Sequence, residues 1–140
     1  MITPGRLDLS VQRWTPFVYQ IDFPWLDFTG ATMAMQARLY RDAPGAPLIS
    51  LSNAASNAEG LSVSVETIDG YVEGGETYDD VTVSTIQIRI NETTAEALLL
   101  NAGKPGDDVR LVYDLHITGG GFPKTRWAEG ALIVRAGATQ

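Results

Sequence analysis

An alternating segment followed by three glycines constrains the fold of this chain more than any other feature. Residues 109–118 (VRLVYDLHIT) place apolar side chains on one face and polar side chains on the other, which is the period-two pattern of a half-buried β-strand. Gly119, Gly120 and Gly121 can adopt the positive φ angles of a tight turn, and residues 124–134 (KTRWAEGALIV) return as an apolar-rich strand. The segment 109–134 therefore predicts a β-hairpin.

Most of the remaining chain shows the same alternation in shorter segments. Strands are predicted over residues 6–12, 14–23, 33–40, 48–52, 61–67 and 81–90. Pro16 indicates an edge position or a break between the first two strands, and Pro24 ends the second. Within residues 81–90 the apolar phase changes, which predicts a β-bulge or a change of sheet near Ser84 and Thr85.

Two further segments carry the signals of a turn and of a helix. Residues 27–31 (DFTGA) fit a tight turn, because the Asp27 side chain can bond backbone amides and Gly30 can take positive φ. Thr93 and Glu96 have the spacing of a capping box, which predicts a helix of at most two turns over residues 93–100. The cluster GKPG at residues 103–106 ends that helix.

These elements together predict an all-β protein. Seven to nine strands with turn signals at short intervals and one short helix are typical of an antiparallel β-sandwich of immunoglobulin-like type. A β-barrel is the main alternative, and strand count alone does not separate the two. The length of 140 residues predicts a single domain over residues 1–140, with flexible tails at 1–5 and 135–140.

The bulk composition argues against several classes of protein. The chain has no cysteine, which removes disulfides, thiolate nucleophiles and sulfur-rich zinc sites. The net charge is −7 and the Lys and Arg residues are scattered singly, which argues against a nucleic-acid partner. No apolar run approaches the roughly 20 residues of a membrane span, and the N-terminus lacks the features of a secretory signal. We therefore expect a soluble protein made in the cytoplasm, with no cofactor.

Candidate sites of chemistry are not supported by their surroundings. His116 follows Asp114 on the polar face of its strand, but no nucleophile motif containing serine accompanies it. The glycines at 119–121 lack the Lys-Ser/Thr pair of a phosphate loop. The carboxylates of residues 69–80 do not have the EF-hand spacing, and no pair of acids is singled out for glycoside hydrolysis. We expect no metal site and no enzymatic activity.

Aromatic and acidic side chains form the candidate interaction surface instead. Residues 69–80 (DGYVEGGETYDD), called the acidic tip below, are longer than a minimal hairpin turn needs. Flat rings with polar edges suit contacts with proteins or with sugar rings. Trp127 lies in an apolar strand and is assigned to the core. The candidate interaction residues are Trp14, Trp25, Tyr71, Glu73, Glu76, Tyr78, Asp79 and Asp80.

Several of these segments together resemble a known group of proteins. Residues 27–31, leading into a strand that ends in Ala37 and Arg38, resemble the D-L-T-G-A…R strand start of small β domains encoded in tailed-phage and prophage structural modules. Residues 94–98 (TAEAL), 112–115 (VYDL) and 127–134 (WAEGALIV) complete that pattern in the same order. The sequence departs from the pattern at Phe28, where leucine is usual, and in the longer acidic tip.

The resemblance implies a non-enzymatic component of a virion. Such domains are often small accessories of the tail, baseplate or fibre region, and related domains also decorate heads and necks. It implies other virion proteins as partners and a symmetric oligomer in the particle. We expect the acidic tip and residues 6–25 to make the contacts between subunits. A carbohydrate-binding module that recognises host surface glycans through its exposed aromatic residues is the alternative.

Overall fold

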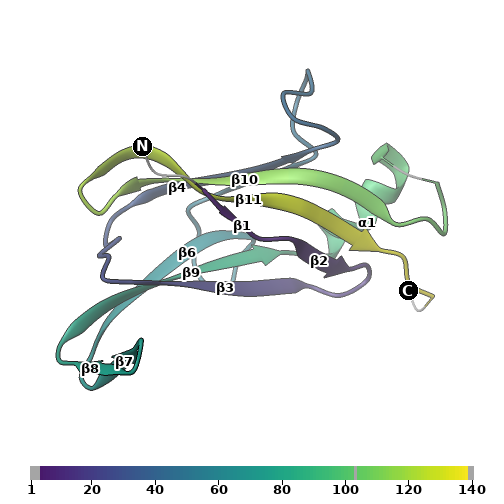
Figure 1. Ribbon diagram of the computed structural model, residues 1–140. Helices are drawn as coiled ribbons and strands as arrows, with labels where there is room; N and C mark the ends of the chain where they lie inside the picture. The colour runs from purple at the N-terminus through teal and green to yellow at the C-terminus, as the bar shows by residue number, and fades with distance from the viewer. Residues whose placement is uncertain (1–3, 103, 139–140) are drawn as a thin grey trace.

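The computed structural model describes residues 4–102 and 104–138 and consists mainly of β-strands (Figure 1). In this part of the chain there are eleven strands and one helix, so the predicted number of seven to nine strands is not confirmed. The elements are β1 (Gly5–Arg6), β2 (Leu9–Gln12), β3 (Phe17–Pro24), β4 (Thr32–Arg38), β5 (Ile49–Ser52), β6 (Gly60–Ile68), β7 (Tyr71–Glu73), β8 (Glu76–Tyr78), β9 (Val81–Ile90), α1 (Glu92–Ala102), β10 (Val109–Gly119) and β11 (Phe122–Arg135).

The larger sheet has six strands and is built around the predicted hairpin. Strands β10 and β11 pair in antiparallel fashion from Val109 and Val134 to Gly119 and Phe122, which confirms the hairpin. The sheet order is β1-β11-β10-β4-β5, and β2 also pairs with β11. The first predicted strand differs from expectation, since β1 and β2 both run parallel to β11. The sheet is therefore mixed, whereas an antiparallel arrangement was expected throughout.

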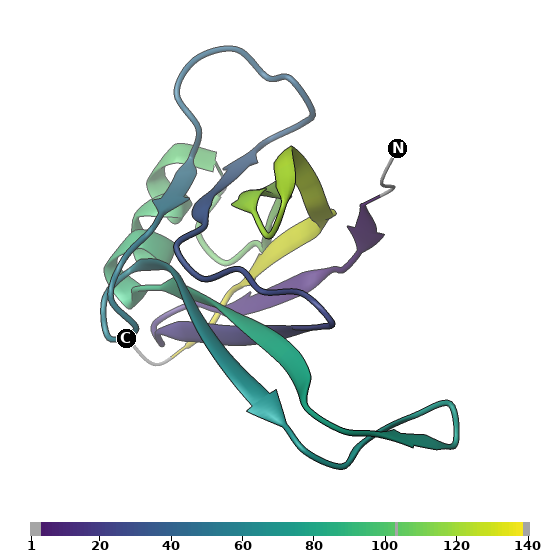
Figure 2. The ribbon, with the colours of Figure 1, turned by 90° about the vertical axis from the view of Figure 1, so that its left-hand side faces the viewer.

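The smaller sheet has three antiparallel strands in the order β3-β9-β6. It lies across the larger sheet, and the ends of β6 and β9 continue away from both sheets into a separate two-stranded ribbon of β7 and β8 (Figures 1 and 2). This ribbon is the acidic tip, which forms a hairpin as predicted. The molecule therefore has two layers and one projecting element.

The apolar core lies between the two sheets. The predicted inward faces of both layers supply it, and its fully buried members include Met33, Met35, Ile86, Ile88, Leu111, Leu115 and Ile117. Trp127 packs edge to face against Phe23, Phe28 and Phe122, with ring centroids 5.3 to 5.8 Å apart. Trp127 is partly buried and packs against the core, so its assignment to the core is confirmed only in part. The all-β prediction is confirmed as well, with the core closed by packing alone.

The first predicted strand is divided into β1 and β2, because its backbone passes close to Gly130 of β11. The register of β1 and β2 against β11 is continuous, but Leu7 and Asp8 leave the ladder opposite Gly130 and Ala131. A Cβ at Gly130 would lie 2.2 Å from the Leu7 carbonyl oxygen. That oxygen accepts a hydrogen bond from the Tyr113 hydroxyl, and Asp8 Oδ1 accepts one from the Ala131 amide at 2.9 Å. Side chains thus replace the missing ladder bonds.

The predicted bulge near Ser84 and Thr85 is wrong. Strand β9 keeps one register against both β3 and β6 through these residues and stays in one sheet. The burial of side chains does change phase, because Val81 and Val83 are buried at odd positions, whereas Ile86, Ile88 and Ile90 are buried at even positions. Ser84 is buried in the same phase as the isoleucines. Its hydroxyl accepts a hydrogen bond from the Phe28 amide at 2.9 Å and donates one to the Leu26 carbonyl at 2.7 Å. A polar side chain is therefore fully buried with both partners satisfied.

The helix is longer than predicted and is capped differently. It has 11 residues, about three turns, and begins at Glu92, so Thr93 lies within the helix and cannot be its N-cap. Asn91 occupies the cap position, and its carbonyl accepts the Thr94 amide at 3.2 Å. Glu59 supplies the missing acid from the loop before β6, because its carboxylate accepts the Asn91 amide at 2.6 Å and the Thr94 hydroxyl at 2.9 Å. The cap is therefore a tertiary contact.

One aspartate holds the turn at residues 27–31, and another holds Arg135 and Ala136. Asp27 Oδ1 accepts the amide of Thr29 at 3.0 Å, and Gly30 has φ of 72°, which confirms the predicted turn. Asp108 accepts the Ala136 amide at 2.9 Å and pairs with Arg135 at 3.0 Å, so the predicted tail begins with two anchored residues. Among the described residues, no helix has the length and apolar character needed to cross a bilayer.

Candidate interaction surface at the acidic tip

The acidic tip is a short two-stranded ribbon with a glycine turn. Strands β7 and β8 pair from Tyr71 and Tyr78 to Glu73 and Glu76, and Gly74 and Gly75 form the turn with φ of 61° and 81°. Such a left-handed conformation strains any side chain with a Cβ, which explains the pair of glycines. Figures 1 and 2 show the ribbon standing away from both sheets. The ribbon therefore projects from the main body.

Trp25 connects this ribbon to the segment that follows β3. Its ring meets Tyr71 and Tyr78 edge to face, with centroids 6.1 and 5.0 Å away. Its Nε1 donates a hydrogen bond to Glu73 at 3.0 Å, and its backbone amide donates to the Thr82 carbonyl at 2.7 Å. These contacts hold the tip in one orientation, although half of the Trp25 surface remains exposed.

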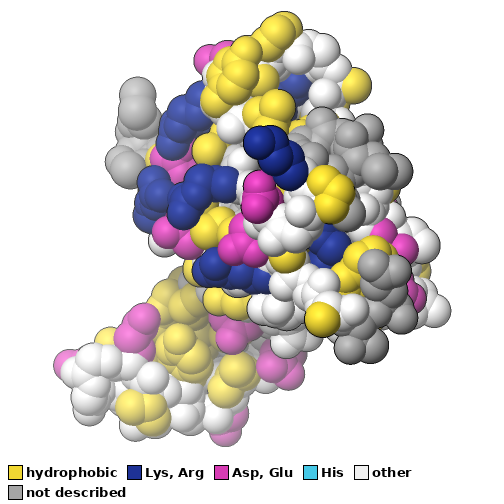
Figure 3. Space-filling model, turned by 90° about the vertical axis from the view of Figure 1, so that its right-hand side faces the viewer, with side chains coloured by type: hydrophobic (Ala, Val, Ile, Leu, Met, Phe, Trp, Pro, Cys, Tyr) yellow, Lys and Arg dark blue, Asp and Glu magenta, His cyan; other side chains and the backbone are white. Residues whose placement is uncertain are grey.

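The charge of the tip is entirely negative. Residues 69–80 contain five carboxylates and no Lys or Arg, in a chain whose total net charge is −7. Figure 3 shows acidic and hydrophobic side chains on the projecting ribbon, while Lys and Arg side chains gather on the body. The hydrogen bond to Glu76 raises the pKa of Tyr78, and burial and the nearby Glu73 charge act in the same direction. The Tyr78 hydroxyl therefore stays a neutral donor among carboxylates.

The predicted interaction residues do not all lie together. The structure joins Trp25 with four residues of β7 and β8: Tyr71, Glu73, Glu76 and Tyr78. Asp79 and Asp80 are exposed in the turn that returns to β9, where Asp80 has φ of 54°. Trp14 lies in the turn between β2 and β3, beside Gly137 at the opposite end of the molecule. Trp14 therefore does not belong to the surface formed by the tip.

The tip carboxylates are not arranged as metal ligands. Glu73 and Glu76 accept hydrogen bonds from Trp25 and Tyr78, which turns these two oxygens toward aromatic donors. Within residues 4–102 and 104–138, no group of three or more His, Asp or Glu side chains is placed to hold a metal ion. The arrangement suits recognition of a basic or hydrogen-bonding surface better than recognition of a cation.

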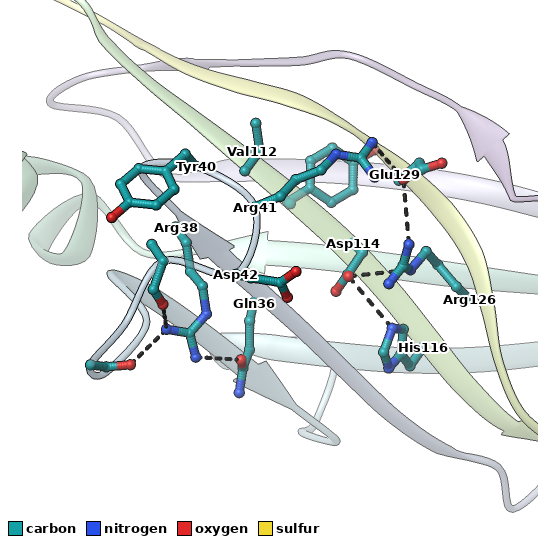
Figure 4. A pocket seen from close by; sticks show the side chains of 13 residues that line it. Gln36, Arg38, Tyr40, Arg41, Asp42, Val112, Asp114, His116, Arg126 and Glu129 are labelled. Atoms are coloured by element: carbon teal, nitrogen blue, oxygen red, sulfur yellow. Dashed lines mark hydrogen bonds and ion pairs between the residues drawn. The ribbon is translucent and has the colours of Figure 1, made fainter.

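A second polar surface lies on the outer face of the larger sheet (Figure 4). Arg126 lies 3.3 Å from Asp114 and 3.7 Å from Glu129, and Arg41 lies 2.8 Å from Glu129. His116 Nε2 is 3.6 Å from the same Asp114 carboxylate. The side chains thus form one chain of alternating charges across β10 and β11. Exposed pairs of this kind contribute little to stability individually.

This polar hollow has a volume of about 560 Å³ and also contains Arg38. The Arg38 guanidinium donates to the carbonyls of Ala43 and Gly45 at 2.9 and 2.6 Å, so it holds the loop after β4. Besides the charged residues named above, His116 shares this hollow with uncharged residues such as Gln36 and Tyr40, and no serine is among the residues that line it. Alternation in β4, β10 and β11 predicts polar outward residues, but no sequence signal predicts that Arg41 of the loop reaches Glu129.

Comparisons with known proteins add no relative to this description. No family model matches the sequence, and no curated protein matches it.

Proposed function

We propose that this chain is a non-enzymatic structural protein of a tailed-phage particle, with an immunoglobulin-like sandwich as its scaffold. The proposal joins the resemblance of residues 27–38, 94–98, 112–115 and 127–134 to one structural observation. That observation is the acidic tip, which projects from the body and is fastened through Trp25. In this proposal the tip docks on a neighbouring virion protein of the tail, baseplate or fibre region.

The contacts of the tip support docking on a protein with a basic surface. Five carboxylates on a short ribbon create a negative field that steers a positively charged partner during encounter. Trp25 and Val72 are about half and two-thirds exposed, so apolar area is available at the centre of the same surface. Aromatic anchors at the centre and a polar rim around them are the usual composition of protein contacts. Because these contacts already hold Trp25 in place, docking would cost less side-chain entropy.

Particle incorporation tests the proposal, because the tip can be altered without touching its aromatic contacts. The variant Asp69→Asn/Asp79→Asn/Asp80→Asn removes three carboxylates, and asparagine tolerates the left-handed backbone of Asp80. We expect it to fold normally and to be depleted from purified particles made with the neighbouring structural genes. The matched control is Asp42→Asn, since Asp42 is also exposed and has φ of 57° on a body loop.

Two outcomes would contradict the proposal. Absence of the wild-type chain from purified particles would exclude a structural role in the virion. Alternatively, the triple variant and Asp42→Asn could be incorporated equally well, which removes the tip as the docking element. A deletion of residues 70–78 provides a stronger version of the same test and should spare folding of the two sheets, because the tip forms its own ribbon. Labelling of particles separates a tail position from head or neck decoration.

Recognition of host glycans is the second candidate function. It is favoured by the exposed half of Trp25, because indole rings stack on pyranose faces. A glycan array followed by titration of tryptophan fluorescence tests it, with Trp25→Phe as the variant and Trp14→Phe as the control at the opposite end of the molecule. A response lost only in Trp25→Phe would favour glycan binding, whereas no response to any glycan would leave protein docking.

A further inference from the structure

The two sides of the sandwich are closed differently, and this difference identifies a free sheet edge. On one side, β5 and β6 are joined by a bridge between Asn53 and Leu61 and by the hydrogen bond from the Ala54 amide to the Leu61 carbonyl. On the other side lies β3, which pairs only with β9. Among the described residues, no strand occupies the other edge of β3. Natural proteins protect such edges, so an eight-residue free edge requires an explanation.

The backbone groups available along this edge follow from the pairing with β9. The Trp25 amide bonds to the Thr82 carbonyl, and hydrogen-bonded pairs alternate along an antiparallel ladder. Odd-numbered residues of β3 therefore bond to β9. The even-numbered residues Val18, Gln20 and Asp22 direct their N–H and C=O groups outward. Three donors and three acceptors thus lie in one row at the surface.

We infer that the free edge of β3 pairs with β3 of a second copy of this chain, antiparallel about a two-fold axis at Gln20. In this register Gln20 of each copy faces Gln20 of the other, and Val18 faces Asp22 twice. All outward donors and acceptors in this row find partners, which gives six hydrogen bonds. The prolines at 16 and 24, which have no amide hydrogen, then face each other and end the ladder at both ends.

Side chains support the same register. Facing residues of paired strands point to the same side of a sheet, so Tyr19 of one copy lies opposite Ile21 of the other on the inward side. That side borders a groove of about 370 Å³ between β1 and β3, lined by Leu7, Tyr19, Ile21, Phe23 and Trp127 among others. The incoming strand would cover this groove and the exposed ring of Tyr19. The incoming strand brings the same apolar side chains, Tyr19 and Ile21, to this contact.

The other edge of this sheet is less available, because Leu61 at the start of β6 already bridges Asn53 and its carbonyl accepts the Ala54 amide. Asp22 is the only charged residue of β3, and in the proposed register it faces Val18. A single added strand buries little area, and we expect an association in the micromolar range or weaker.

A single cysteine tests the two-fold axis directly, because the natural chain contains none. Facing Cα atoms of a hydrogen-bonded antiparallel pair are about 5.5 Å apart, which is within the range that a disulfide spans. We expect oxidised Gln20→Cys to give a covalent dimer. Ser64→Cys is the matched control, since Ser64 is also exposed on the same sheet but lies on β6. Equal cross-linking of the two variants, or none, would overturn the inference.

Charge substitutions at Val18 test the register. Val18→Asp places an acid opposite Asp22 twice, and we expect the dimer dissociation constant to rise about twofold to thirtyfold in sedimentation equilibrium. Val18→Lys should lower it. Val18 is nearly half exposed, so both variants should keep the wild-type unfolding midpoint. A chain that is monomeric at every concentration, or a shift in the same direction for both variants, contradicts the pairing. These results do not depend on the virion role, which particle incorporation tests separately.

Discussion

Replacing Ser84 by alanine tests how the segment between β3 and β4 is held. Ser84 is fully buried, and its hydroxyl makes two short hydrogen bonds, to the Phe28 amide and the Leu26 carbonyl. Alanine has nearly the same volume, so the change creates almost no cavity. The Phe28 amide and the Leu26 carbonyl then lose their hydrogen-bond partner. Each buried polar group left unpaired costs about 1–3 kcal/mol. We expect Ser84→Ala to lower the free energy of unfolding by about 3 kcal/mol.

Urea denaturation measures this change, with the slope of the transition as a check that the denatured state is unaltered. For a chain of this size, about 3 kcal/mol corresponds to a fall in Tm of roughly 8–12 °C. Thr85→Val is the matched control, because the Thr85 hydroxyl bonds only to Asp22 at an exposed position and should cost below about 1 kcal/mol. Equal losses in the two variants, or a loss under about 0.5 kcal/mol for Ser84→Ala, would refute the argument.

Three further predictions concern the contacts that divide the first strand and cap the helix. Gly130→Ala should destabilise the protein by about 1–3 kcal/mol in urea denaturation, because its Cβ would overlap the Leu7 carbonyl oxygen. The hydrogen bond from the Ala131 amide, aided by the charge of a neighbouring arginine, lowers the pKa of Asp8. The stability linked to this depressed pKa is present above about pH 4 and is lost as pH falls through the folded-state value, so Asp8→Asn should show a shallower acid limb. Glu59→Ala should cost about 1 kcal/mol and increase amide exchange in the first turn of α1, because both its hydrogen bonds there are lost.

Each of these predictions has an internal comparison. Gly5→Ala should be nearly neutral, because the nearest atom to its added Cβ is a carbonyl oxygen 3.7 Å away. An equal loss of stability in Gly5→Ala and Gly130→Ala would argue against overlap of the added Cβ with the Leu7 carbonyl oxygen. Asp107→Asn serves as an exposed control for Asp8→Asn, and identical acid limbs for the two variants would exclude a special role for Asp8. For Glu59→Ala, exchange at the start of α1 that matches the wild type would show that Asn91 caps the helix alone.

The sequence predicted the strands whose two faces differ most in polarity. Residues 109–134 gave the central hairpin because period-two alternation and the glycine run act over short distances, where local preference decides the backbone. The turn at Asp27 and Gly30 was predictable for the same reason. The packing of Trp127 against the core was predictable from its apolar neighbours.

Features decided by contacts between distant residues were not predictable in this way. The burial of Ser84 had no local signal, because its partners Leu26 and Phe28 lie more than 50 residues away. The helix cap was misplaced because its carboxylate comes from Glu59, more than 30 residues before α1. Parallel pairing of β1 and β2 with β11 also has no local signal, since alternation is identical in parallel and antiparallel strands.

The candidate surface shows the same division. The acidic tip and its tyrosines could be singled out from residues 69–80 alone, because glycines and carboxylates between two strands mark an exposed hairpin. That Trp25 fastens the tip while Trp14 lies at the far end became clear only from the tertiary structure. Local sequence determined which segments are strands and turns, since backbone preference and side-chain alternation act between near neighbours. The packing of the two sheets decided which distant side chains meet, because a buried polar group needs a partner wherever the chain can supply one.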